Sequence, residues 1–77
     1  MKDLLEYLAK GLVDKPEEVA VDSFEEDDGT VVLELHVADD DVGKVIGRSG
    51  RTVNALRTVI RASSVKHGRR VLVDVVD

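Results

Sequence analysis

The stretch Val45-Ile46-Gly47-Arg48-Ser49-Gly50-Arg51-Thr52 decides how this chain folds. An apolar helix end is followed by two glycines three positions apart, and a new helix begins directly after them. Glycines at 47 and 50 let the backbone approach a ligand closely. The first turn of the following helix presents unpaired N–H groups and a partial positive charge, which favour anions. The stretch therefore predicts a phosphate-binding Gly-x-x-Gly turn, with Arg48 and Arg51 adding a full charge on either side.

Apolar periodicity predicts the elements next to this turn. A short helix capped by Asp39 or Asp40 leads to about Ile46, and a longer helix runs from about residue 51 to 66. On the longer helix, one arc is expected to pack and the opposite arc is basic. The packing arc contains Val53, Leu56, Val59, Ile60 and Ser63, and the basic arc contains Arg51, Asn54, Arg57, Thr58 and Arg61.

The rest of the chain supplies three strands and one more helix. An amphipathic helix over 3–13, with Asp3 as its cap and Glu6 as the partner of that cap, comes first and ends before Pro16. β-Branched residues predict strands over 19–24, 30–38 and 70–76, and Asp28-Gly29 joins the first two as a hairpin.

The predicted order is α-β-β-α-α-β, which indicates an α+β fold with a three-stranded mixed sheet and three helices on one face. A right-handed crossover through the turn places the last strand parallel to the second. The 77 residues are expected to form one domain, 1–77. On the sheet face away from the helices we expect Val32, Leu72 and Val76.

Composition limits the function classes. The chain has no cysteine, and its two histidines, His36 and His67, are too few and too far apart to indicate a metal site. Near the turn we expect neither a nucleophile beside a base nor a close pair of carboxylates. The sequence therefore does not indicate an enzyme, and it does not indicate a cofactor. The absence of a long apolar run favours a cytoplasmic protein that does not enter a membrane.

The charge is divided between the two halves of the chain. Residues 1–42 carry 14 acidic side chains against three lysines, a formal charge of −11, whereas residues 43–77 carry eight Lys/Arg against two aspartates, a charge of +6. A polyanion is therefore attracted to the second half although the whole chain has a charge of −5. The spacing matches neither a Walker nucleotide site nor a dinucleotide-binding fingerprint, because Val45 stands where the first Walker glycine is needed and Gly43, Gly47 and Gly50 are wrongly spaced.

With a Gly-x-x-Gly turn between two helices in a β-α-α-β unit, preceded by an extra helix and strand, the chain resembles a type II KH domain. It is similar to the small stand-alone bacterial KH proteins of the KhpA (YlqC-type) family, and the resemblance covers essentially all 77 residues. The resemblance implies non-catalytic binding of single-stranded RNA, or of single-stranded DNA, with the loop at 47–50 clamping about four nucleotides. It also implies a post-transcriptional regulator or RNA chaperone.

Carried over position by position, the resemblance assigns roles to ten residues. Gly47 and Gly50 permit close approach of the strand, and Arg48 and Ser49 contact phosphates. The groove wall is formed by Lys44, Val45, Ile46, Arg51, Asn54 and Arg57, with Ile46 as an apolar floor for a base. Bases are expected to meet aliphatic side chains and the edge of the second strand at 32–35. The near absence of aromatic residues agrees with a groove of this kind rather than with an aromatic stacking platform.

Two features depart from a simple RNA clamp. The loop at 25–29 is acidic and should repel a longer strand. The basic loop at 66–70 either receives the strand or is only a solvated helix end, where cations are favoured by the helix dipole. An alternative function is a protein-interaction module that pairs with itself or with another KH-containing RNA-binding protein, since a dimer of weak clamps gains avidity.

Overall fold

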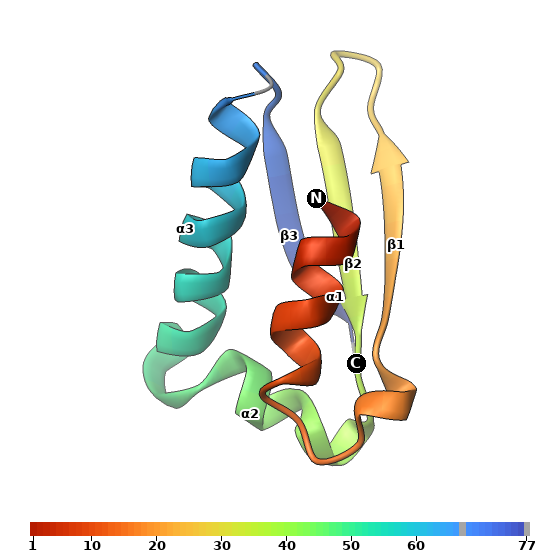
Figure 1. Ribbon diagram of the computed structural model, residues 1–77, viewed down its shortest axis with the longest axis vertical. Coiled ribbons are helices and arrows are strands. Elements are labelled where there is room, and N and C mark those ends of the chain that lie inside the picture. Colours follow the sequence, from red (N-terminus) through yellow and green to blue (C-terminus); the bar gives the residue numbers. More distant parts are fainter. Residues whose placement is uncertain (67, 77) are drawn as a thin grey trace.

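The computed structural model describes residues 1–66 and 68–76 and contains the predicted helices and strands in the predicted order (Figure 1). It adds short 3₁₀ turns, labelled η, at chain reversals. The elements are α1 (Lys2–Lys10), η1 (Pro16–Glu18), β1 (Ala20–Glu25), β2 (Val31–His36), η2 (Asp39–Asp41), α2 (Val42–Ile46), η3 (Arg48–Gly50), α3 (Arg51–Val65) and β3 (Val71–Val76).

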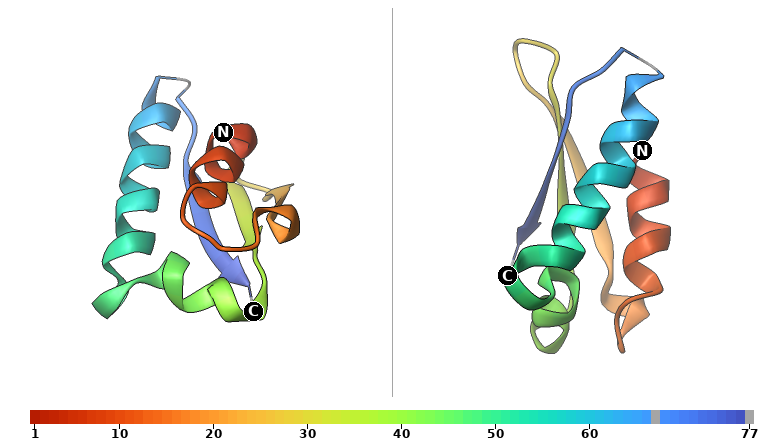
Figure 2. Two further views of the ribbon diagram at one scale, coloured as in Figure 1. Left: turned by 60° about the horizontal axis from the view of Figure 1, so that its bottom comes forward. Right: turned by 90° about the vertical axis from the view of Figure 1, so that its left-hand side faces the viewer.

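The three strands form one mixed sheet in the order β1-β2-β3, with β1 antiparallel and β3 parallel to β2. The helices lie on one face of the sheet, and the other face is uncovered (Figure 2). The α+β fold expected from the sequence is confirmed. One detail was wrong: β2 is the central strand, so both of its edges are paired and cannot meet bases. The edge beside α3 belongs to β3.

An aliphatic core lies between the helices and the sheet. Strand residues of odd number face the helices, because side chains alternate along a strand. The fully or nearly buried members of this core are Leu5, Ala9, Val19, Val21, Leu33, Leu35, Val45, Leu56, Ile60, Val71 and Val73. Among the described helices, none is long and apolar enough to cross a membrane.

The first helix begins and ends earlier than the sequence suggested. Met1, not Asp3, is its N-cap, and no side chain caps it. The helix ends at Lys10 because Gly11 follows, and glycine is a poor helix former. Leu12, which the predicted helix over 3–13 included, lies beyond the helix end and is 40% exposed.

The packing face of α3 is narrower than the predicted arc. The buried residues are Val53, Leu56, Ile60 and Ser64, spaced three and four apart as in a single helical stripe. Val59 is 45% exposed and Ser63 is half-buried, so both were wrongly placed in the core. Ser64 is buried in their place and donates a hydrogen bond of 2.8 Å to the Arg61 carbonyl.

Candidate nucleic-acid interface

The Gly-x-x-Gly turn lies between α2 and α3, at the end of the molecule opposite the β1–β2 hairpin (Figure 1). Three of its four residues have positive φ: Gly47 at 75°, Ser49 at 55° and Gly50 at 75°. Ser49 is the only non-glycine among the described residues with such a φ, and polypeptides hold this conformation at a cost of about 1–3 kcal/mol. The turn therefore has an uncommon backbone conformation, and Ser49 is the position where this conformation is costly.

The two glycines serve the turn in different ways. A Cβ added at Gly47 would overlap the side chain of Thr52 and lie 2.9 Å from the Thr52 amide nitrogen. A Cβ at Gly50 would have Asn54 Nδ2, 3.8 Å away, as its nearest neighbour. Gly47 is thus required because the turn packs tightly on α3, whereas Gly50 is required for its left-handed backbone.

Exposed polar groups gather around the turn. Arg48, Ser49 and Arg51 are all exposed, and Arg48 and Arg51 make no ion pair within the part of the chain that the structure describes. The first turn of the 15-residue α3 has no side-chain cap, although the Arg51 N–H donates to the Arg48 carbonyl. Two uncompensated cations and a helix N-terminus therefore converge at one place.

Lys44 is engaged differently from these arginines. Its Nζ donates to Asp14 Oδ2 at 2.7 Å and to Asp41 Oδ1 at 3.3 Å. The hydrogen bonds to Asp14 and Asp41 raise the pKa of Lys44 above its ordinary value. Its positive charge is shared with two carboxylates, so it attracts a phosphate less strongly than Arg48 does.

Asp41 fixes the start of α2. The predicted caps, Asp39 and Asp40, make no cap hydrogen bond, and the carboxylate of Asp41 is 1% exposed. It accepts hydrogen bonds from the backbone N–H groups of Asp14 at 3.2 Å and Lys15 at 3.0 Å. Burial alone would raise the pKa of Asp41, but these two amides and Lys44 lower it overall. The carboxylate thus ties the segment after α1 to the helix that leads into the turn.

Replacing Asp41 with asparagine is expected to lower the free energy of unfolding at neutral pH and to flatten its dependence on acid pH. Because the folded pKa of Asp41 lies below the ordinary value of 3.8, its contribution is complete above that value and disappears as pH falls through the folded pKa. Urea unfolding of both proteins across acidic pH measures this. Asp40→Asn removes an 82% exposed carboxylate as the control, and an equal change in the control would contradict the prediction.

The apolar lead-in to the turn divides into core and surface. Val45, which we expected along the groove, is 0% exposed and belongs to the core, so it has no surface to offer a ligand. The reason is that α2 has only five residues and buries its single inward position. Ile46, half-buried beside the turn, still presents apolar surface.

A groove lies between α3 and the edge strand β3, and it begins at Arg57, seven residues after Gly50. Arg57 lies at the end of the groove nearest the turn. It is half-buried and does not lie on a free basic face as predicted. Its Nε donates to the Val73 carbonyl at 3.1 Å and its Nη1 donates to Asn54 Oδ1 at 3.3 Å. The groove consists of two adjoining hollows of about 220 and 310 Å³, and both are lined by Arg61, Val71 and Leu72. The groove thus has arginine along one wall and aliphatic strand residues along the other.

The sequence placed Arg61 on the basic arc of the helix but not in the groove wall, and it assigned Leu72 and β3 no role in the nucleic-acid site. Arg61 is four residues after Arg57, so the two arginines lie on the same side of α3. At the far end, Arg69 Nη1 lies 3.9 Å from Glu25 Oε1, so part of the basic 66–70 loop pairs with the first hairpin. His67 of that loop lies outside the described residues. Arg70 lines the upper hollow and is exposed.

Comparison with known proteins adds a family match. Residues 2–75 match the protein-family model described as KhpA/KhpB, KH domain. The chain is 50% identical to the RNA-binding protein KhpA of Clostridium acetobutylicum, over 99% of this chain and 100% of that protein. It is 52% identical to the RNA-binding protein KhpA of Streptomyces coelicolor, over 100% of this chain and 92% of the other.

Solved structures of Era share the fold. Era in complex with MgGDPNP and nucleotides 1506–1542 of 16S ribosomal RNA superposes with a TM-score of 0.67 at 18% identity. The match covers 96% of this chain and 28% of the Era chain. At this identity the similarity concerns the fold alone.

Proposed function

Because this chain belongs to the KhpA/KhpB family of KH domains, a family of RNA-binding proteins and not of enzymes, we propose that it binds single-stranded RNA. We propose further that residues 1–77 act as one KH domain. The observation that carries the proposal is the convergence of Arg48, Ser49 and the start of α3, which has no side-chain cap, on one exposed turn.

In the proposed complex, the turn holds the sugar–phosphate backbone of about four nucleotides. Arg48 and Arg51 neutralise phosphates, and the Ser49 hydroxyl and the N–H groups at the start of α3 donate hydrogen bonds to phosphate oxygens. If the turn keeps this backbone conformation in the complex, little ordering entropy opposes binding. These contacts set the path of the strand and carry no base preference.

The bases are proposed to enter the groove between α3 and β3. Ile46 supplies an apolar floor next to the turn, and Asn54 and Arg57 continue the wall along α3. Arg57 is already held by Val73 and Asn54, so its guanidinium is oriented before RNA arrives. Lys44 contributes at the entrance, with its charge reduced by its two carboxylate partners. Further along, the acidic 25–29 loop limits the length of strand that the groove accepts.

The double variant Arg48→Asp/Ser49→Asp tests the clamp. Two new negative charges in place of a cation and a hydroxyl are expected to weaken binding of a short single-stranded RNA by about tenfold to hundredfold. Fluorescence polarisation at several salt concentrations measures the affinity. For the native protein, log K should fall with log salt by about 0.7 per phosphate contacted.

The control for this experiment makes the same charge change away from the turn. Lys2→Asp/Ser23→Asp alters an exposed cation and an exposed hydroxyl on α1 and β1. It should retain most of the native affinity, and circular dichroism should show both variants folded. If the two double variants bind equally well, the turn is only structural and the proposal fails.

The cellular role that fits such a clamp is that of a post-transcriptional regulator or RNA chaperone in the cytoplasm. A single clamp of four nucleotides binds weakly and exchanges quickly, which suits a protein that acts on many transcripts. A single-stranded DNA competitor in the same titration shows whether the 2′-hydroxyl contributes.

A second candidate function is pairing with another copy or with another KH-containing RNA-binding protein. The uncovered face of the sheet carries a register row of apolar residues, Phe24, Val32 and Leu72. Phe24 is 51% and Leu72 41% exposed, an unusual placement for such side chains. Size exclusion at low and high protein concentration separates this role from RNA binding alone.

A further inference from the structure

The uncovered face of the sheet also brings together carboxylates that are distant in the sequence. In the register of the sheet, Asp22 of β1 lies opposite Glu34 of β2, which lies opposite Asp74 of β3. Like charges directly opposite one another on neighbouring strands destabilise a sheet. A cation on this face would relieve that repulsion.

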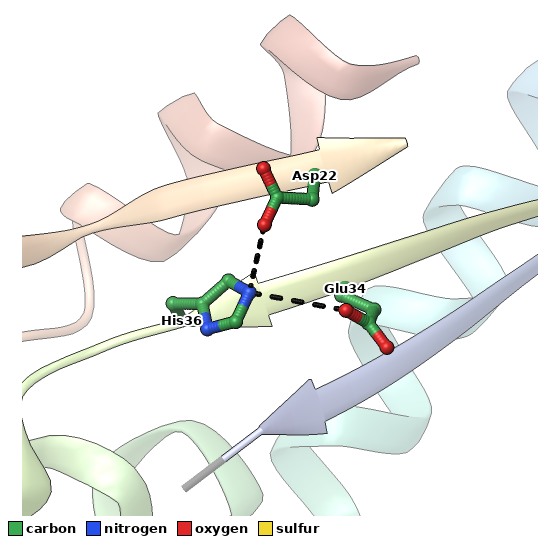
Figure 3. Close-up of side chains that lie close together, drawn as sticks. All are labelled: Asp22, Glu34 and His36. Carbon is green, nitrogen blue, oxygen red and sulfur yellow. Dashed lines mark ion pairs between the residues drawn. The ribbon is translucent and has the colours of Figure 1, made fainter. Parts of the chain in front are cut away.

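An imidazole points into the same place. His36 lies two residues after Glu34, on the same face of β2, and its Nε2 is 3.1 Å from Asp22 Oδ2 and 4.0 Å from Glu34 Oε1 (Figure 3). Despite this proximity, Nε2 is buried and forms no hydrogen bond among the described residues. An imidazole nitrogen that faces two carboxylate oxygens without an aligned hydrogen bond is a candidate ligand for a bound cation.

We propose that His36, Asp22 and Glu34 form a binding site for a divalent transition metal, of which Zn²⁺ is the probe. One ligand atom from each residue lies within 4.8 Å of the other two. Tetrahedral zinc with bonds of about 2.0–2.1 Å needs ligand atoms about 3.3 Å apart. The pair from His36 and Asp22 already meets this spacing. The Glu34 carboxylate, with Oε1 4.0 Å from Nε2, must move closer to become the third ligand.

The mixed ligand set decides the class of metal. Imidazole nitrogen with two carboxylate oxygens suits zinc and its neighbours, whereas Mg²⁺ and Ca²⁺ prefer oxygen ligands throughout. Three protein ligands leave a fourth position open to solvent. Two adjacent strands hold all three side chains, so the fold positions the site in advance. It lies on the face away from the helices, apart from the turn proposed to bind RNA.

The test is calorimetric titration of Zn²⁺ into the full chain and four variants. His36→Gln and Asp22→Asn remove proposed ligands. His67→Gln removes the other histidine of the sequence, and Asp27→Asn removes an exposed carboxylate of the β1–β2 loop. Ca²⁺ and Mg²⁺ are titrated in parallel, and thermal melts with and without Zn²⁺ show whether the metal binds the folded state.

We expect one Zn²⁺ per chain, a loss of affinity of at least about tenfold in His36→Gln and Asp22→Asn, and native affinity in the two controls. Zn²⁺ should raise the melting temperature of the native protein and of the controls only. Equal binding by all five proteins, or Ca²⁺ binding as tight as Zn²⁺, overturns the proposal. So does an absence of Zn²⁺ binding, in which case His36 only forms an ion pair with Asp22.

Discussion

Replacing Gly47 with alanine is expected to lower the free energy of unfolding by roughly 2–6 kcal/mol, as the sum of backbone strain and overpacking. At φ 75° and ψ 172° the backbone is in a region that only glycine occupies readily, and the new methyl group would collide with Thr52. A 77-residue domain has a total stability of about 4–12 kcal/mol, so the loss is a large fraction of it. Urea unfolding followed by circular dichroism measures the change.

Gly50→Ala is the matched control for this experiment. It has the same φ of 75°, but the added methyl group meets nothing closer than 3.8 Å. Its expected cost is about 1–2 kcal/mol, from the left-handed backbone alone. Equal losses at the two positions would mean that backbone conformation alone accounts for both glycines, and that the tight packing of Gly47 on α3 has no energetic weight.

The second large effect is expected in the core beneath α3. Ile60 is 0% exposed and packs between α3 and the sheet. Ile60→Ala should destabilise the fold by about 2–5 kcal/mol, through lost burial and the cavity left behind. Thermal or urea unfolding gives the value.

Val59→Ala provides the comparison, because Val59 is the neighbouring residue and is 45% exposed. Its change should stay within about 0.5 kcal/mol, as for most surface substitutions. If Val59→Ala lowered the free energy of unfolding as much as Ile60→Ala, Val59 would belong to the packing face of α3, as the periodicity suggested.

Local patterns made much of the fold predictable. The hairpin at Asp28-Gly29 forms as expected, with Thr30 N–H donating to Asp28 Oδ1 at 2.9 Å and Gly29 at φ 87°. The end of α3 near Gly68 and the position of the Gly-x-x-Gly turn were equally readable. In each case the deciding interactions lie within a few residues of one another.

The errors at the candidate site concern contacts between distant segments. The burial of Val45 and Asp41, and the bond from Arg57 to Val73, depend on how α1, α2 and β3 meet, which no local pattern encodes. Strand register is another feature of this kind, because it places His36 next to carboxylates from two strands, which a count of histidines does not show.

The parallel pairing of β2 with β3 has a consequence for the order of events during synthesis. The two strands are joined by a crossover that contains α2, the turn and α3, so the turn emerges from the ribosome well before β3 does. Val73, whose carbonyl accepts the hydrogen bond from Arg57, is part of β3 and is therefore synthesised after the turn and α3. The nascent chain therefore carries its Gly-x-x-Gly turn before it has the second wall of the groove, and the groove is complete only when the last strand joins the sheet.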